Sequence, residues 1–367
     1  MLVGSGVVGR EIAKCHVDRG IGFHWLDTDA TSLTRTANDL SSLGGEIEAT
    51  KWIDDLHRIE MLADGSVRAG APEFGDSPLV IESIVEQADA KSALFQSLHG
   101  AFGDACMLAS NTSTLRIAEL AKPSFAERLI GMHFFMPVTQ RDGVEIIPHD
   151  GTNAQVRDAA WAHARRLAKR PFLAPDDAGF IVNRMLSPYL NECLWMACEG
   201  VSASTMAAAA TRYGMPISPF RLIDTIGLAT TLRAGTCYVR VFPDAIEPCP
   251  VITRMVKLGR ISGDLPQMLE PDAEVFTTEA QAVFDRYRRD RRKMSVSEIV
   301  ERMRLPMRCE AAALRRIHGV RDSTIDAAMS GGLAFRTVPG WTAEERAADT
   351  ATQRQVAKDF GVRMPKV

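Results

Sequence analysis

The sequence predicts an α/β fold, in which an N-terminal doubly wound sheet is followed by two all-α helical domains that form an internal repeat. Short apolar strands alternate with helical segments up to about Pro148, and a glycine-rich loop follows the first strand. After Pro171, helical patterns rich in Ala, Leu and Met dominate. We therefore expect three domains, at residues 1–172, 173–285 and 286–367.

The strands expected in the first domain are short apolar runs with helices between them. They cover residues 1–3, 23–26, 78–84, 106–109, 129–135 and 144–147, and the first helices cover residues 10–19 and 91–99. Pro78 fits only the first position of its strand, because proline cannot donate to the ladder. Ser113 follows a strand and is expected to cap the next helix. This alternation predicts a largely parallel sheet with helices on both faces.

Composition excludes several classes of protein. The chain has 367 residues, 24% of them charged, and a formal net charge of −3, so neither nucleic acid nor an anionic membrane is expected as the main partner. Neither a bilayer-spanning apolar run nor a leader is recognisable, which predicts a soluble, cytoplasmic protein. The seven cysteines and eight histidines are scattered, so we expect reduced, mostly buried thiols and no metal site.

The helical half contains an internal repeat. Residues 181–188 match residues 299–306, which lie 118 positions later with a proline in step, and the same offset places Glu192 over Glu310. A duplicated helical domain explains this match better than chance. The polar stretch at residues 287–293 lies between the copies. A solvated helix end or linker is the preferred interpretation, with a binding patch as the alternative.

The loop at residues 4–9 fits the pattern G-x-G-x-x-G between a strand and a helix. The first glycine permits a tight turn, the second lets the backbone approach a pyrophosphate, and the third lets helix and strand pack closely. The unpaired N–H groups of the helix N-terminus then face the phosphates. A glycine turn in an unrelated α/β protein is the alternative. The context favours a Rossmann-type dinucleotide site with these cofactor-binding residues: Gly4, Gly6, Val7, Val8 and Gly9.

Asp27 ends the second strand, 18 residues after Gly9, where it can accept hydrogen bonds from the ribose hydroxyls. A carboxylate there repels a 2′-phosphate, so the sequence favours NAD over NADP. Arg10, beside the loop, is the one feature that would tolerate a phosphate. The first strand has only three residues before Gly4, whereas strands usually have about five or six. This predicts either a longer natural polypeptide or a start that is assigned late.

His133 closes an apolar strand and Glu145 lies in the next one. Oxidation of an alcohol by hydride transfer needs a base for the hydroxyl proton, and histidine titrates near working pH. A carboxylate behind the ring would orient it and stabilise the imidazolium. From the residues alone, a histidine packed in the core beside Phe134 and Phe135 is the more common alternative.

Several segments resemble the L-3-hydroxyacyl-CoA dehydrogenase family. They are residues 131–137, 144–147, 110–115, 179–184 and 219–224, the last followed by Gly227 and Leu228. Their order and spacing agree with the family, and the resemblance extends into the second helical copy, at residues 303–320. The architecture is most similar to the dehydrogenase part of multifunctional fatty-acid β-oxidation proteins, which carry two helical domains after the Rossmann domain.

The resemblance implies oxidation of a (3S)-3-hydroxyacyl-CoA to the 3-ketoacyl-CoA, with reduction of NAD, in fatty-acid β-oxidation. By this resemblance, His133 matches the catalytic base and Glu145 its partner carboxylate. Ser113 matches a serine that hydrogen-bonds the substrate oxygen, and Asn183 matches an asparagine that contacts the reacting substrate.

The cofactor-binding set implied by the resemblance extends beyond the glycine loop. Glu86 and Lys91 match residues near the nicotinamide ribose, and Asn111 is expected in the same set. A solvated helix face is the alternative for Glu86 and Lys91 when the residues are taken alone. For Ser113, an ordinary helix cap is the alternative, and it does not exclude the catalytic role.

Three features depart from the family pattern. Met136 stands where the family usually has Asn. Residues 30–75 do not resemble the basic helical hairpin that helps to bind CoA, and residues 259–264 are a reduced form of a glycine- and aromatic-rich stretch. The cations within residues 30–75 are Arg35, Lys51, Arg58 and Arg68. Together these departures predict a lower turnover or a shifted substrate.

The second helical copy carries Glu301 where the first carries Asn183, so we interpret the second copy as structural. We expect the two copies to pack pseudo-symmetrically, in a monomer or in a subunit of a β-oxidation assembly that takes an acyl-CoA substrate. Two other functions stay open. One is a catalytically weakened NAD- and acyl-CoA-binding subunit, and the other is a related NAD enzyme acting on a small hydroxy acid without CoA.

Overall fold

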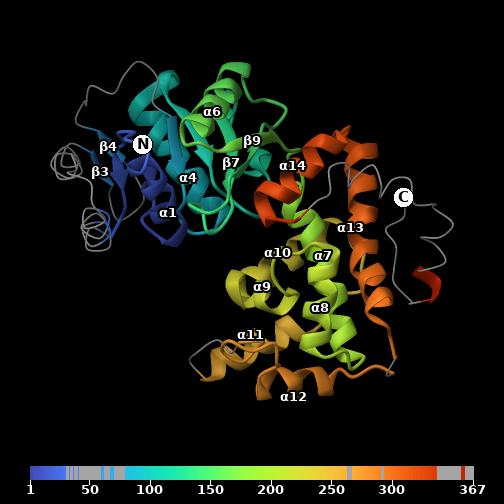
Figure 1. Ribbon diagram of the computed structural model, residues 1–367. Coiled ribbons are helices and arrows are strands. Elements are labelled where there is room, and N and C mark those ends of the chain that lie inside the picture. The colour runs from blue at the N-terminus through green and yellow to red at the C-terminus, as the bar shows by residue number, and fades with distance from the viewer. Residues whose placement is uncertain are drawn as a thin grey trace. The chain divides into compact units, whose positions relative to one another are not determined.

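The computed structural model forms two compact units, Met1–Asp177 and Ala178–Val367 (Figure 1). It describes residues 1–29, 33, 36, 40, 59–61, 67–69, 79–262, 267–290, 293–336 and 357–359. Most of residues 30–75, together with residues 263–264, lie outside this range, as does Pro78. The predicted departures in those segments therefore fall largely outside the described residues.

The first unit is built on a seven-stranded sheet, ordered β2-β1-β5-β6-β7-β8-β9. Its strands are β1 (Leu2–Val3), β2 (Trp25–Leu26), β5 (Leu79–Glu82), β6 (Met107–Ser110), β7 (Leu129–Phe134), β8 (Gly143–Ile147) and β9 (Arg170–Leu173). All neighbours are parallel except β7 and β8. The strand order reverses between β1 and β5, which is where a doubly wound sheet binds its ligand. Strands β3 (Ile59–Met61) and β4 (Val67–Ala69) form a separate antiparallel pair.

Helices cover both faces of the sheet because alternate strand residues point to opposite sides. Helices α1 (Val7–Val17) and α6 (Ala154–Arg166) share a core cluster with Ile130, Met132 and other strand residues. Helix α5 (Ile117–Leu120) covers the other face, where a Cβ on Gly131 would lie 2.9 Å from Ile117 Cδ1. Helix α4 (Ala88–Phe102) packs against α5. Each large apolar side chain buried in this way contributes about 1.5–3 kcal/mol.

Two local details differ from the sequence-based expectations. Strand β9 was not among the expected strands; it contains Pro171 and lies at the edge of the sheet, where proline is tolerated. The expectation that Ser113 caps the next helix is wrong, because α5 begins at Ile117 with Arg116 as the N-cap residue. Asp176 performs the capping from a distant part of the chain, since its carboxylate accepts from the backbone N–H groups of Ile117 and Ala118.

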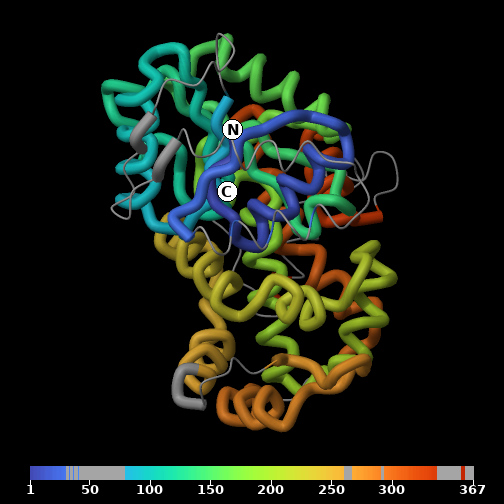
Figure 2. Tube along the Cα trace, turned by 90° about the vertical axis from the view of Figure 1, so that its left-hand side faces the viewer, coloured from blue at the N-terminus to red at the C-terminus, as the bar shows by residue number. Residues whose placement is uncertain are grey.

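The second unit is helical. Its helices are α7 (Val182–Cys198), α8 (Ala203–Tyr213), α9 (Pro219–Ile226), α10 (Leu228–Val241), α11 (Val251–Ser262), α12 (Thr278–Arg286), α13 (Val296–His318) and α14 (Asp322–Leu333). Helix α13 packs against both α7 and α8 (Figures 1 and 2). The predicted fold class, a doubly wound sheet followed by helical structure, is confirmed.

The internal repeat has a structural counterpart in two buried ion pairs between α7 and α13. Arg184 in α7 binds Glu310 in α13, with 2.6 Å between Arg184 Nε and Glu310 Oε2. In return, Arg302 in α13 binds Glu192 in α7, with 2.8 Å between Arg302 Nε and Glu192 Oε1. The partners are related by the 118-residue offset, so the two segments that match in sequence contact each other through reciprocal ion pairs.

All seven cysteines are free thiols, and all except Cys237 are buried. Within the described ranges, no helix has both the length and the apolar character needed to cross a membrane.

Candidate active site

The glycine loop has the geometry that its three glycines predict. Gly4 has φ +102°, and a Cβ there would lie 2.4 Å from Ser83 O. A Cβ on Gly9 would lie 2.1 Å from Gly4 O, so helix α1 packs directly on the turn. Gly6 is exposed, and a Cβ there would meet nothing within 4 Å. The first and third glycines are therefore required for packing, while the second leaves open space beside the backbone.

The N-terminus of α1 and the end of β2 meet at this loop. Gly6 is the N-cap residue of α1, without a side-chain cap, and the first turn carries no acidic residue. Its N–H groups and the positive end of the helix dipole thus favour an anion such as a pyrophosphate. The Asp27 carboxylate accepts hydrogen bonds from the backbone N–H groups of Ser5 and Asp29. Two carboxylate oxygens offer about four acceptor sites, so Asp27 retains capacity for ribose hydroxyls.

Exposed apolar side chains gather around the same edge of the sheet. Val7 is 72% exposed in the glycine loop and Val85 is 62% exposed shortly after β5. Met136 is 39% exposed and follows β7. The carboxyl ends of parallel strands meet at one edge, so these side chains border the edge that carries the glycine loop. Apolar side chains there suit the flat faces of nucleotide rings.

His133 and Glu145 face each other across β7 and β8. They are directly opposed in the antiparallel ladder, so their side chains lie on the same face. His133 Nδ1 lies 2.6 Å from Glu145 Oε2, with His133 at 6% and Glu145 at 0% exposure. A carboxylate only accepts hydrogen bonds, so Nδ1 carries the proton and Nε2 of the neutral ring is the acceptor. The ring is therefore oriented as a general base needs to be.

The loop after β7 is fixed at two points. The buried Lys169 ammonium donates to the backbone carbonyls of Val138 and Arg141. Thr139 donates to the Glu11 carboxylate in α1, with 3.1 Å between Oγ1 and Oε2. The loop that carries Met136 is thus tied to the helix that follows the glycine loop.

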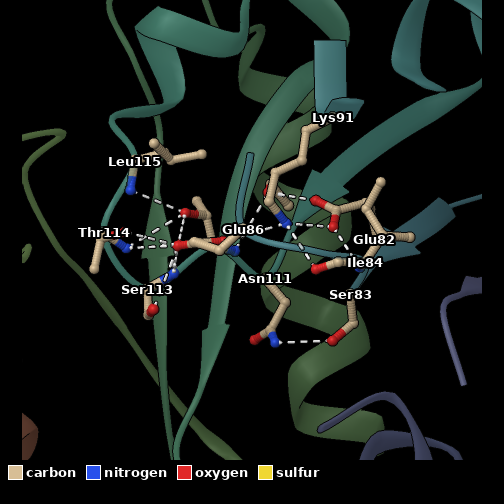
Figure 3. A network of polar contacts seen from close by, with 11 residues as sticks. Glu82, Ser83, Ile84, Glu86, Lys91, Asn111, Ser113, Thr114 and Leu115 are labelled. Atoms are coloured by element: carbon tan, nitrogen blue, oxygen red, sulfur yellow. Dashed lines mark hydrogen bonds and ion pairs between the residues drawn. The ribbon is translucent and has the colours of Figure 1, made fainter. Parts of the chain in front are cut away.

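Glu86, Lys91 and Ser113 belong to one polar network (Figure 3). Glu86 Oε1 accepts from the backbone N–H groups of Ser113 and Thr114 at 2.9 and 3.0 Å. It also accepts from the hydroxyls of Thr112 and Thr114 at 2.7 and 2.9 Å, and from that of Ser113 at 3.3 Å. Glu86 Oε2 lies 3.4 Å from Lys91 Nζ.

The environment of Glu86 favours its ionised form. Burial alone would raise the pKa of Glu86, but the Lys91 ammonium and the hydrogen bonds from Thr112, Thr114 and Ser113 hold it below its usual value. The solvated helix face considered for these residues does not describe Lys91, which is 1% exposed. Glu86 therefore presents a fixed negative charge beside Ser113.

Asn111 connects three strands at the same edge. Its Oδ1 accepts from the backbone N–H of Phe134 at 2.9 Å, one residue after His133. Its Nδ2 donates to Ser83 Oγ at 3.3 Å, and its backbone N–H donates to Glu82 O at 2.8 Å. Asn111 thus holds the ends of β5, β6 and β7 in register.

Glu82, Ser110 and Asp176 take part in this architecture, although sequence reasoning did not select them. Glu82 closes β5 and Ser110 closes β6, opposite each other in the parallel ladder. A charged residue at the end of an apolar strand was the available signal for Glu82.

Asn183 belongs to the second unit, near the start of α7, where its backbone carbonyl accepts a hydrogen bond from Ser187 Oγ at 2.8 Å.

The sheet topology and the glycine loop at this edge define a Rossmann-type domain. The family model for the 3-hydroxyacyl-CoA dehydrogenase NAD binding domain matches residues 1–177, and the model for the C-terminal domain of the same family matches residues 179–267. The chain belongs to the 3-hydroxyacyl-CoA dehydrogenase family, as its sequence motifs predicted.

Individual relatives agree with this assignment. The chain is 29% identical over 248 residues to the fatty acid oxidation complex subunit alpha of Psychrobacter cryohalolentis. The matched region covers 67% of this chain and 34% of that protein. The chain therefore spans about a third of the length of the curated relatives it matches.

Solved structures share the fold. The crystal structure of 3-hydroxybutyryl-CoA dehydrogenase from Escherichia coli K12 has a TM-score of 0.70 at 19% identity, covering 98% of this chain and 99% of that chain. The (S)-3-hydroxybutyryl-CoA dehydrogenase from Ralstonia eutropha has a TM-score of 0.59 at 26% identity, covering 73% of this chain and 98% of that chain.

Proposed function

We propose that the protein oxidises (3S)-3-hydroxyacyl-CoA to 3-ketoacyl-CoA with NAD as the hydride acceptor, a step of fatty-acid β-oxidation. The observation that carries this proposal is the buried contact of 2.6 Å between His133 Nδ1 and Glu145 Oε2, on the sheet edge that also bears the glycine loop. The match to both domains of the dehydrogenase family supports it.

The residues at the sheet edge fit NAD. The open space at Gly6 and the uncapped start of α1 suit the pyrophosphate, with Val7, Val8 and Gly9 continuing the loop. Asp27 would bind the adenosine ribose and repel a 2′-phosphate. Glu86, with Lys91, Asn111 and Ser113, would form the nicotinamide side of the site. When bound, NAD accepts the hydride from C3 of the substrate.

The chain's own residues handle the proton. His133 Nε2 takes the proton of the substrate hydroxyl while Glu145 holds the ring and stabilises the imidazolium. Ser113 hydrogen-bonds the same substrate oxygen, and Asn183 matches, by the family resemblance, an asparagine that contacts the reacting substrate. Met136 supplies no amide at the position where the family usually has Asn, so we expect turnover below that of relatives with Asn.

The relatives named as subunits of fatty acid oxidation complexes support two further proposals. The chain acts within such an assembly or as a monomer, with the second helical copy at residues 286–367 as a structural partner of the first at residues 173–285. We also place this activity in the cytoplasm, as the composition of the sequence predicts.

The test is NADH oxidation by the full chain with acetoacetyl-CoA, with longer 3-ketoacyl-CoA substrates and with free acetoacetate. We expect turnover of the CoA substrates, with NADH preferred over NADPH. Turnover of free acetoacetate alone would indicate a hydroxy-acid dehydrogenase that does not use CoA. NADH binding without turnover of any substrate would indicate a binding subunit.

A further inference from the structure

Glu82 is a fully buried carboxylate at the carboxyl end of β5, at 0% exposure. A buried charge is costly unless it is paired and hydrogen-bonded. Glu82 Oε1 accepts from the Lys91 ammonium and, at 2.7 Å, from the backbone N–H of Ile84. Glu82 Oε2 accepts from the Ser110 hydroxyl at 2.7 Å (Figure 3 shows the Lys91 side of this arrangement). The proposed chemistry does not use Glu82 directly, although it lies within the same network.

Two routes lead from Glu82 to the turn formed by residues 112–114, which carries Ser113. The first passes through Ser110, whose hydroxyl oxygen accepts from the backbone N–H of Thr112 at 3.3 Å. The second passes through Lys91, which binds both Glu82 and Glu86. Glu86 then holds the turn through hydrogen bonds from three consecutive residues. Both routes therefore fix the turn from which the Ser113 hydroxyl projects.

The charges make Glu82 more than a space-filling side chain. Lys91 carries one positive charge and is shared between two carboxylates. If Glu82 were neutral, Glu86 would be the one charged carboxylate left at Lys91 among the described residues, and Lys91 would draw it away from the turn. The Ser110 hydroxyl would lose its charged acceptor at the same time, and charge-assisted hydrogen bonds are about twice as strong as neutral ones. Both changes release the turn.

We propose that Glu82 is a positioning residue for the active site, which sets the place of Ser113 through Ser110 and through the Lys91–Glu86 pair. This rests on the proposed function, in which Ser113 binds the reacting oxygen. A displacement of about 1 Å at a reacting centre can reduce the rate by about 100-fold. The hydrogen bonds of Glu82 lead to Lys91 and Glu86, on the proposed nicotinamide side of the site, and not to Asp27 or the glycine loop, which would hold the rest of the cofactor. We therefore expect a larger effect on kcat than on NADH affinity.

The test compares Glu82→Gln, Ser110→Ala and a matched control, Glu199→Gln. Glu199 is also a buried carboxylate bound to a buried cation, Arg302, but it lies in the helical unit. Three quantities are measured on the full chain: NADH affinity by fluorescence, the melting temperature, and kcat with acetoacetyl-CoA per folded molecule. We expect Glu82→Gln to lower kcat by about 10- to 100-fold and to lower NADH affinity by a smaller factor than kcat.

Ser110→Ala interrupts one route only and should lower kcat by about 3- to 10-fold, whereas Glu199→Gln should leave kcat unchanged. A kcat within 2-fold of wild type for Glu82→Gln would overturn the proposal, because a purely structural role lowers stability without changing kcat. If Glu82→Gln does not fold, an unchanged kcat in Ser110→Ala overturns it instead. Wild-type protein that does not oxidise NADH would refute the proposed function itself, which is a distinct outcome.

Discussion

Replacing Arg302 by Met should destabilise the helical unit strongly. Arg302 is 2% exposed and binds both Glu192 and Glu199, which are 7% and 8% exposed. Burial already raises the pKa of Glu192, against the opposing effect of Arg302. Without the guanidinium, two buried carboxylates face each other. Removing one partner of a buried ion pair costs about 3–5 kcal/mol.

The assay is thermal unfolding followed by circular dichroism. For a unit of the size of Ala178–Val367, about 1 kcal/mol shifts the melting temperature by about 2–4 °C, so we expect Arg302→Met to melt about 10 °C earlier. The control is Arg288→Met, which removes a half-exposed pair with Asp285 worth about 0.2–0.5 kcal/mol. Equal, small shifts in the two variants would refute the view that the reciprocal pairs hold α7 and α13 together.

Two further predictions concern the sheet domain. His16 Nε2 lies 2.9 Å from His163 Nε2, and burial lowers the pKa values of these residues to about 4 and about 3. The unfolded chain therefore binds more protons than the folded chain between about pH 4 and 6.5, so the free energy of unfolding falls as pH falls, by about 2 kcal/mol for His16 between pH 7 and 5. Urea unfolding at a series of pH values should show this loss. A variant with Asn at both positions that keeps the full pH dependence of the wild type would contradict it. Gly9→Ala places a Cβ 2.1 Å from Gly4 O and should weaken NADH binding at least about 10-fold. Gly100→Ala, in α4 with nothing within 4 Å of the added Cβ, should not weaken it, and equal affinities in these two variants would contradict the packing role of Gly9.

Local sequence patterns predicted the elements whose signals lie within a few residues. The apolar runs that become β5, β6, β7 and β8 are buried strands, and the spacing of the glycine loop reflects real contacts at Gly4 and Gly9. The edge strand β9 has only one buried residue, Phe172, so it lacks the continuous apolar run that reveals a central strand.

Contacts between distant residues were beyond these patterns. Asp176 caps α5 from about 60 residues away, and no local capping rule can find such a partner. The repeat offers an instructive contrast. The 118-residue offset aligns Arg184 with Arg302 and Glu192 with Glu310, so the repeat already contained the residues of both ion pairs. Which arginine binds which glutamate could be predicted only with the knowledge that α7 packs on α13.

The role of His133 as the base is tested most directly by His133→Gln. The variant keeps a polar side chain of similar size but cannot take up the substrate proton. NADH affinity and kcat/KM with acetoacetyl-CoA are measured for wild type and variant. We predict unchanged NADH affinity and a loss of kcat/KM of about 10²–10⁴-fold. Activity that survives in His133→Gln would contradict the proposed mechanism.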